Sequence, residues 1–223
     1  MKKLHLRKFL DFYDHKVETS RGHASAISAV LGEDLGVTLL CHYFAKQGLK
    51  INALPETCAT GQKKGPRLDK WIAVNSELES VIYQVEIKNW SAHSIGGTTI
   101  RQGMTSDELI AYRKDRWGRQ FKTIDAFHTP SQDGTKKVLT KMSVPSSHRN
   151  SQHRALLCFW EGLHPEGKDE PFFKVNVSNE NFHQLYLFSM SNYIGQLLEH
   201  TETLEVTMID TDNRIDWLNQ MYN

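Results

Sequence analysis

The first third of the chain carries hydrophobic residues at helical spacing. Between about Ala24 and Gln47 they form one stripe along the expected helix, made of Ala26, Val30, Val37, Leu40 and Phe44. Gly48 follows directly, and because glycine is common just past a helix end, the helix is predicted to stop there. Glu33 lies within the stripe, where a carboxylate is costly unless it meets a partner or a metal ion.

Strict alternation replaces this pattern between Val81 and Lys88. The apolar residues at 81, 83, 85 and 87 share one face of the expected strand, and Glu86 and Lys88 lie side by side on the other. A preceding strand is predicted over 67–74, with a polar turn at 75–80. The two strands therefore form a predicted hairpin that brings acidic residues of both together.

Helices and strands interleave in the rest of the chain. Thr105 and Glu108 have capping-box spacing, which predicts a helix from there to about Gln120. The continuous apolar run at 155–160 is typical of a strand buried on both faces. Further strands are predicted at 172–177 and 204–209, and further helices at 182–198 and 212–221. The class is thus α/β or α+β, with a mixed central β-sheet flanked by helices.

The composition is that of an ordinary globular protein. The chain has 223 residues, of which 39% are hydrophobic and 24% charged, which suggests one domain and excludes a disordered or fibrous protein. No apolar run approaches the roughly 18 residues of a membrane span. Charges interrupt the basic start before a secretory signal can form, so a cytoplasmic location and no membrane partner are expected. Three widely spaced cysteines argue against a disulfide framework or a zinc site.

The net charge of +1 hides an asymmetry along the chain. Residues 1–160 hold 24 lysines and arginines against 15 aspartates and glutamates, whereas residues 161–223 hold 3 against 11. A basic part of this kind favours an anionic partner such as nucleic acid. Simple segregation of charges on a solvated surface explains the numbers equally well.

The acidic residues of the hairpin carry the most specific chemistry. Asp69 and Glu86, on adjacent strands, are able to hold a hard divalent cation, Mg²⁺ or Mn²⁺, which needs one or two carboxylates plus water and substrate phosphate. A metal so placed activates water and stabilises charge on a phosphodiester. Lys88 shares the face of Glu86, where it orients the attacking water or neutralises the developing charge.

This arrangement resembles the PD-(D/E)XK nuclease superfamily, the restriction-endonuclease-like fold. The matching pieces are Glu33 on the first helix, Asp69 in GPRLDKWI, and Glu86 and Lys88 in YQVEIKNW. The resemblance covers roughly residues 24–120, which contain the order helix, strand, strand, helix, and it implies a core with α-β-β-β-α-β order. It also implies that Asp69 and Glu86 ligate the metal, that Lys88 is the catalytic lysine and that Glu33 supports the site. One departure is Leu68, which stands in place of the family's proline.

A glutamate and a lysine two residues apart are by themselves weak evidence. A second such pair, Glu166 and Lys168, lies in a loop-like stretch and is not assigned a role. The structural alternatives are a surface ion pair for Glu86 and Lys88, a strand-end ion pair for Asp69 and a backbone-bonded buried carboxylate for Glu33. Their combination with a clean strand pattern favours the nuclease interpretation.

The expected function is therefore a Mg²⁺-dependent DNA endonuclease in a single domain, residues 1–223. Residues 121–223 are expected to complete the sheet and to carry specificity or dimerisation elements, and the resemblance suggests a homodimer. The alternative is a catalytically silent nucleic-acid-binding or protein-interaction module on the same fold. No nucleotide-binding loop is present. DNA versus RNA, the target, and the process (restriction, defence or repair) stay open.

Several basic residues are candidates for contacts to the nucleic acid. A solvated surface is the competing interpretation for each of them, and for the loop histidine it is favoured. The candidates are Arg67, His93, Arg113, Arg116 and Arg119.

Overall fold

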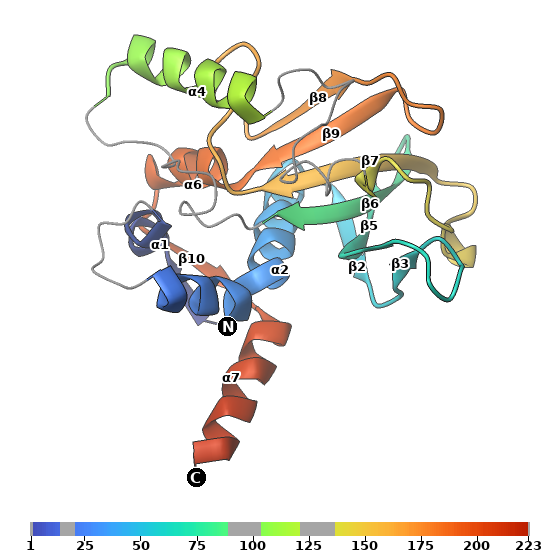
Figure 1. Ribbon diagram of the computed structural model, residues 1–223, viewed down its shortest axis with the longest axis horizontal. Coiled ribbons are helices and arrows are strands. Elements are labelled where there is room, and N and C mark those ends of the chain that lie inside the picture. The colour runs from blue at the N-terminus through green and yellow to red at the C-terminus, as the bar shows by residue number, and fades with distance from the viewer. Residues whose placement is uncertain (1, 14–20, 89–103, 121–136, 223) are drawn as a thin grey trace.

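The computed structural model describes residues 2–13, 21–88, 104–120 and 137–222 (Figure 1). Among these residues the strands form a six-stranded mixed sheet, in the order β2-β5-β6-β7-β9-β8, and two small two-stranded sheets. The strands are β1 (Lys2–His5), β2 (Lys50–Leu54), β3 (Cys58–Ala59), β4 (Arg67–Leu68), β5 (Lys70–Asn75), β6 (Ser80–Lys88), β7 (Gln152–Phe159), β8 (Phe172–Asn176), β9 (Gln184–Ser189) and β10 (Thr203–Val206). The helices are α1 (Leu6–Tyr13), α2 (Arg21–Lys46), α4 (Ser106–Gln120), α6 (Met190–Leu198), α7 (Ile209–Tyr222) and the short 3₁₀ helix η2 (Ser146–His148).

The main sheet changes from antiparallel to parallel at β6. Strands β2, β5 and β6 form an antiparallel meander, β6, β7 and β9 run parallel, and β8 closes the edge antiparallel to β9. The chain passes through α2, β2, β5, β6, α4 and β7 in that order, with the β3–β4 hairpin inserted before β5. Lys88 of β6 and Phe159 of β7 are paired, so the carboxyl ends of these two parallel strands meet at one edge of the sheet.

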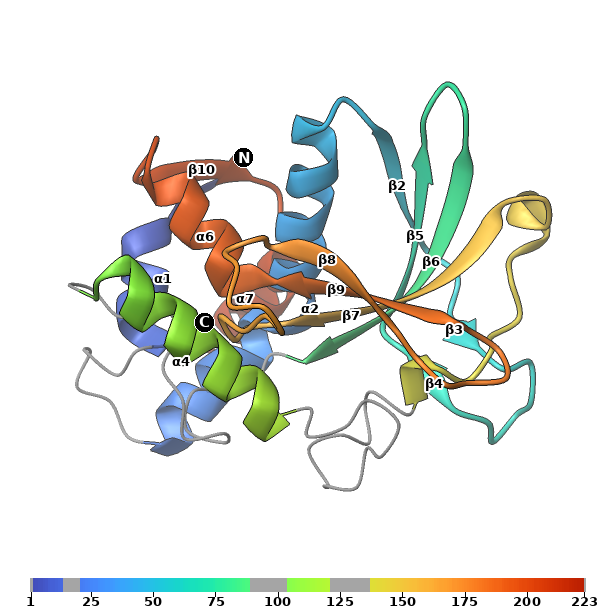
Figure 2. The ribbon, with the colours of Figure 1, turned by 90° about the horizontal axis from the view of Figure 1, so that it is seen from above.

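Each face of the sheet is covered by a hydrophobic cluster. On one face, side chains of α1, α2 and α6 pack against the odd-numbered residues of β6. On the other face, Val138, Leu139 and Met142 cover the sheet together with residues of β8 and the partly buried Trp117 of α4. Figure 2 shows the helices gathered around the end of the sheet toward which β6 points. No described helix is long and apolar enough to cross a membrane.

Most of the predicted elements are present, but one is wrong. Residues 182–198, predicted as a single helix, contain strand β9 followed by helix α6. The reason is that β9 is an internal strand of the sheet, between β7 and β8, and its residues pack into both hydrophobic clusters, Phe188 into one and Leu185 and Leu187 into the other. A continuous apolar run does not distinguish such a strand from a buried helix. Strands β1, β2 and β3 and helix α1 were not predicted.

The long first helix is interrupted where the hydrophobic stripe was expected to continue. Gly32 has φ 40° and ψ −132°, which breaks α2 into two helical parts. The helical phase is therefore not continuous, and Ala26 and Glu33 are exposed while Leu35 and Leu39 are buried. The prediction that Glu33 lies on a buried stripe is wrong for this reason.

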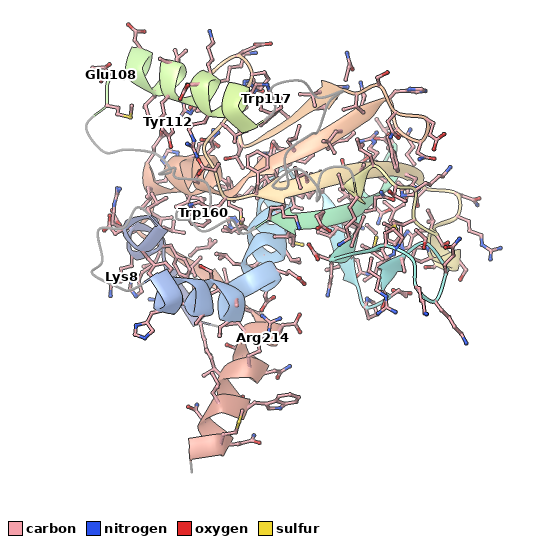
Figure 3. All side chains as sticks on the ribbon, in the orientation of Figure 1. Lys8, Glu108, Tyr112, Trp117, Trp160 and Arg214 are labelled. Atoms are coloured by element: carbon pink, nitrogen blue, oxygen red, sulfur yellow. The ribbon has the colours of Figure 1, made fainter. Side chains whose placement is uncertain are left out.

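The C-terminal helix α7 stabilises this break. Arg214 donates from Nη1 to the carbonyl oxygen of Val30, at 2.7 Å, and to that of Ala29, at 3.4 Å, which satisfies carbonyls that lose their helical partners (Figure 3). On the other side of the break, the Asp34 carboxylate accepts a hydrogen bond from the backbone N–H of Thr211, at 3.0 Å. The two helices therefore hold one another at the kink.

Replacing Gly32 by alanine is expected to destabilise the protein by about 1–3 kcal/mol, because only glycine adopts this backbone conformation without strain. A Cβ at this position also lies 3.3 Å from the Arg214 guanidinium. Urea denaturation measures the change. Gly118→Ala, on α4 in open space, is the control and is expected to stabilise by up to about 1 kcal/mol. Equal effects of the two substitutions would contradict this account of the kink.

Candidate metal and phosphodiester site

The candidate site lies at the edge where β5 begins and β6 ends. Lys70 pairs with Val85 across the two antiparallel strands, so the chain just before β5 runs beside Glu86. Glu86 and Lys88 share a face of β6, as the alternating pattern predicted. The structure therefore brings Asp69, Glu86 and Lys88 together at the carboxyl end of β6.

Asp69 interrupts the strand predicted over 67–74. Its backbone N–H donates to the carbonyl oxygen of Val85, at 3.0 Å, and its Oδ2 accepts the backbone N–H of Ile87, at 2.5 Å. The side-chain carboxylate thus takes the role of a backbone carbonyl in the ladder between the strands. This hydrogen bond fixes the position of one Asp69 oxygen next to Glu86 and leaves the other for a ligand.

Glu86 is the most buried carboxylate of the site, with 1% of its surface exposed. Lys88 Nζ donates to its Oε1 at 2.5 Å. Lys137 Nζ lies 3.4 Å from Oε1 and 3.3 Å from Oε2. Although Oε2 is inaccessible to solvent, it accepts no hydrogen bond from the described residues. Two lysines from distant parts of the chain therefore share one buried carboxylate.

Burial and mutual repulsion make the charged forms of both carboxylates unfavourable. Burial raises the pKa of Asp69 to about 6; the hydrogen bond from Ile87 opposes this rise, and the negative charge of Glu33 adds to it. Burial likewise raises the pKa of Glu86, against the hydrogen bond from Lys88, and the charge of Asp69 adds to that rise. A cation bound between the two carboxylates relieves this repulsion.

Glu33 is placed at the margin of the site. Its charge acts on Asp69, although its side chain is exposed at the start of the second part of α2. Within the described residues, no three histidine, cysteine, aspartate or glutamate side chains form a metal-binding cluster. Asp69 and Glu86 lie side by side as the sequence predicted, and Glu33 lies near enough for its charge to act on Asp69.

Gln84 links the segment that carries Lys137 to the site. This fully buried amide lies two residues before Glu86 on the same face of β6. Its Nε2 donates to the carbonyl oxygens of Val138 and of Thr140, the latter at 2.9 Å, and its Oε1 accepts from the backbone N–H of Met142 at 3.0 Å. This tether holds the start of the segment, and with it Lys137, over Glu86.

Neither Lys137 nor Gln84 was predicted from the sequence to belong to the site. Lys137 and Glu86 are 51 residues apart, and the lysine sits in a polar stretch without periodicity. The position of Gln84 was the one sequence feature that indicated a further polar contact here, because it is a polar residue on the same strand face as Glu86 and Lys88.

The basic residues considered for nucleic-acid contacts have different environments. Arg67 is exposed on β4, whereas Arg113 and Arg116 are buried residues of α4. Arg116 donates to the buried Glu161 at 3.1 Å, so its charge is directed inward rather than toward solvent. His93 and the side chain of Arg119 lie outside the described residues. The second glutamate–lysine pair, Glu166 and Lys168, forms an exposed ion pair at 2.7 Å.

Comparisons of the chain with protein-family models, with curated proteins and with solved structures find no match. The function of the site is therefore interpreted from the chemistry of its own residues.

The tether also predicts how stability depends on pH. His153 Nε2 lies 2.8 Å from Gln84 Oε1, and because that oxygen only accepts, the ring donates. Burial, with the positive charge of Lys141 adding to it, lowers the pKa of His153 from 6.5 to about 4. Between these values the unfolded chain binds the proton and the folded chain does not. The free energy of unfolding is therefore expected to fall as the pH drops from about 6.5 to about 4.

The contribution of His153 is isolated by comparison with His153→Gln, which keeps a donor for Gln84. Denaturant titrations between pH 7 and pH 4 are expected to show about 1–2 kcal/mol less acid destabilisation in the variant, after allowance for partial solvent screening. The comparison is needed because Asp69, whose pKa is raised, acts in the opposite direction. Identical pH profiles would contradict the assignment of a neutral, buried His153.

Proposed function

We propose that the protein is a metal-dependent nuclease that hydrolyses phosphodiester bonds in DNA. The observation that carries this proposal is the juxtaposition of Asp69, Glu86 and Lys88 at the carboxyl end of β6. One buried and one half-buried carboxylate beside a lysine suit a divalent cation and a phosphate group together. The excess of basic residues in residues 1–160 supports an anionic substrate.

The residues of the site fit a resident Mg²⁺ or Mn²⁺. Glu86 Oε2 is buried and without a hydrogen bond from the described residues, and the pKa values of both carboxyls are raised. Carboxylate oxygens are the ligands that hard cations prefer. Asp69 and Glu86 would hold the ion, which when bound supplies activation of water and stabilisation of charge at the scissile phosphate.

The chain's own residues have distinct tasks in this proposal. The hydrogen bond from Ile87 holds the Asp69 carboxylate in place before substrate arrives. Lys88 supplies positive charge, or takes up a proton, next to the reacting phosphate. Lys137 brings a second positive charge to the same point. Pre-organisation of this kind lowers the cost of collecting charged groups around a phosphodiester.

The order of elements supports a restriction-endonuclease-like core. The helix α2, the strands β2, β5 and β6, the helix α4 and the strand β7 follow the α-β-β-β-α-β order of that fold, and β6 and β7 are parallel neighbours. In this proposal the metal ligands are Asp69, which directly precedes β5, and Glu86 of β6, and α2 carries the supporting Glu33.

A second candidate function is a catalytically silent binding module on the same fold. The observation that favours it is the ion cluster itself, because Lys88 and Lys137 already neutralise Glu86 without a metal ion. Buried ion clusters of this kind also serve purely structural ends. The two candidate functions differ in the expected effect of replacing Lys88 on DNA cleavage and of replacing Lys137 on Mn²⁺ binding.

Lys88→Met is expected to reduce cleavage by about 10²- to 10⁴-fold, because it removes the charge nearest the reacting phosphate. Cleavage of plasmid and oligonucleotide DNA is measured with Mg²⁺, with Mn²⁺ and with EDTA. The matched control is Lys168→Met, which removes the lysine of the exposed glutamate–lysine pair and is expected to cut like the wild type. Thermal unfolding checks that both variants are folded.

The absence of cleavage by folded wild-type protein with either metal, or full activity in Lys88→Met, would overturn the proposed mechanism. The first result favours the silent binding module.

Lys137→Met is expected to tighten Mn²⁺ binding roughly tenfold, because it removes a positive charge that competes for both oxygens of Glu86. Calorimetry or the electron paramagnetic resonance of Mn²⁺ measures the affinity in the absence of nucleic acid. Lys141→Met, an exposed lysine in the same segment, is the control. Unchanged or weaker Mn²⁺ binding in Lys137→Met would show that Glu86 is not a metal ligand.

A further inference from the structure

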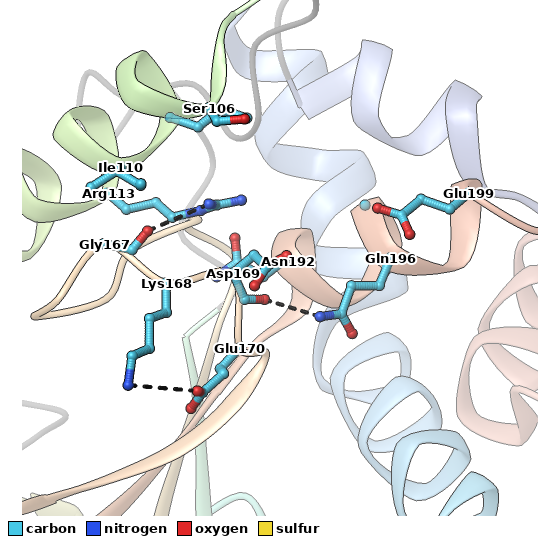
Figure 4. A pocket seen from close by; sticks show the side chains of 12 residues that line it. Ser106, Ile110, Arg113, Gly167, Lys168, Asp169, Glu170, Asn192, Gln196 and Glu199 are labelled. Carbon is cyan, nitrogen blue, oxygen red and sulfur yellow. Dashed lines mark hydrogen bonds and ion pairs between the residues drawn. The ribbon is translucent and has the colours of Figure 1, made fainter.

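A pocket lined by both polar and apolar side chains lies between α4, the segment 167–170 and α6 (Figure 4). Its volume is about 430 Å³, and its lining includes none of the residues of the metal site. Leu109 and Ile110 of α4 form an aliphatic wall, and Gly167 allows the chain to pass close to that helix. A Cβ at Gly167 would lie 2.6 Å from the carbonyl oxygen of Ile110, and φ of Gly167 is 77°.

Arg113 brings a positive charge into this pocket. Only 7% of its surface is exposed, and Figure 4 shows its side chain running from α4 toward the space in front of α6. Among the described residues its one hydrogen bond goes to the carbonyl oxygen of Gly167, at a long 3.5 Å, and its Nε has no acceptor. Arg113 has no ion pair within 4 Å in the described residues, although the more distant charge of Asp169 acts on it. A buried guanidinium compensated only at a distance is costly, so the pocket favours a ligand with an anionic group.

Asn192 supplies a second set of unsatisfied groups. The residue is 1% exposed, and neither the nitrogen nor the oxygen of its amide has a hydrogen-bond partner in the described part of the chain. Buried amides are normally paired, and each unpaired one calls for an explanation such as a ligand. Asn192 is therefore able to donate a hydrogen bond from Nδ2 and to accept one at Oδ1 from the same ligand.

The remaining charges of the lining restrict the kind of ligand. Asp169 and Glu199 bring carboxylates to the pocket, whereas Lys168 is engaged by Glu166 and Glu170. A phosphate dianion meets one guanidinium against several carboxylates and is disfavoured. A neutral nucleobase leaves the buried charge of Arg113 with only the more distant carboxylate of Asp169.

We propose that this pocket binds a small zwitterion of the α-amino-acid class. The ligand's carboxylate pairs with the Arg113 guanidinium and the Asn192 N–H, and its ammonium group faces Asn192 Oδ1 and the carboxylates of Asp169 and Glu199. Leu109 and Ile110 provide apolar surface for an aliphatic side chain. Guanidinium and carboxylate form paired, charge-assisted hydrogen bonds, which gives the carboxylate its orientation.

Titration calorimetry on the full chain tests this proposal, in EDTA and without nucleic acid. The twenty standard amino acids are screened first. Leucine is then compared with 4-methylpentanoate, which lacks the amine, and with 3-methylbutylamine, which lacks the carboxylate. Aliphatic amino acids are expected to bind, and each truncated analogue is expected to bind at least about tenfold more weakly.

Two variants and a control locate the binding. Arg113→Lys keeps the charge but loses the paired donors, and Asn192→Leu removes the amide; each is expected to weaken binding about tenfold or more. Lys114→Gln, exposed on α4, is expected to bind like the wild type. Because Asn192→Leu replaces an unpaired buried amide, its melting temperature is expected to equal or exceed that of the wild type.

The proposal is overturned if no amino acid binds the folded protein, or if inorganic phosphate or guanosine binds in its place. A loss of stability in Asn192→Leu with binding unchanged would also overturn it and would assign Asn192 a structural role. None of these results depends on nuclease activity, so the two proposals fail separately.

Discussion

The buried carboxylate of Glu86 is the interaction on which the rest of the site depends. A carboxylate removed from water requires compensating charge, and this structure supplies it from Lys88 on the same strand and Lys137 on a distant segment. Gln84 holds that segment by its backbone, so the second lysine is tied to the strand that carries the carboxylate. The hydrogen bonds that fix the path of this segment therefore also place the positive charge that compensates Glu86.

The surrounding fold explains why this cluster lies at an edge rather than in the core. Strands β6 and β7 are parallel, so both end at the same side of the sheet, where the ladder gives way to side chains. Asp69 replaces a backbone acceptor at that point, and the break of α2 at Gly32 places Glu33 at its margin. Ligands of open α/β sheets bind outside the carboxyl ends of the strands, which is where this cluster lies.

The sequence predicted the parts of the site that local periodicity controls. Alternation along β6 placed Glu86 and Lys88 on one face, and the hairpin placed Asp69 beside them; both features are present. Lys137 was beyond such reasoning, because its contact with Glu86 depends on the tertiary tether through Gln84. The exposure of Glu33 was also missed, since periodicity assumes a continuous helix and Gly32 breaks it. Strand β9 was mistaken for helix because burial on both faces removes the alternation.

The most direct test of the metal-site assignment is a crystal structure with Mn²⁺, with the anomalous scattering of the metal measured. We expect a single strong anomalous peak for a Mn²⁺ ion that is coordinated by carboxylate oxygens of both Asp69 and Glu86. Lys88 is then displaced from Glu86 Oε1. A structure in which both lysines remain on Glu86, and no peak lies between the two carboxylates at saturating Mn²⁺, would contradict this assignment.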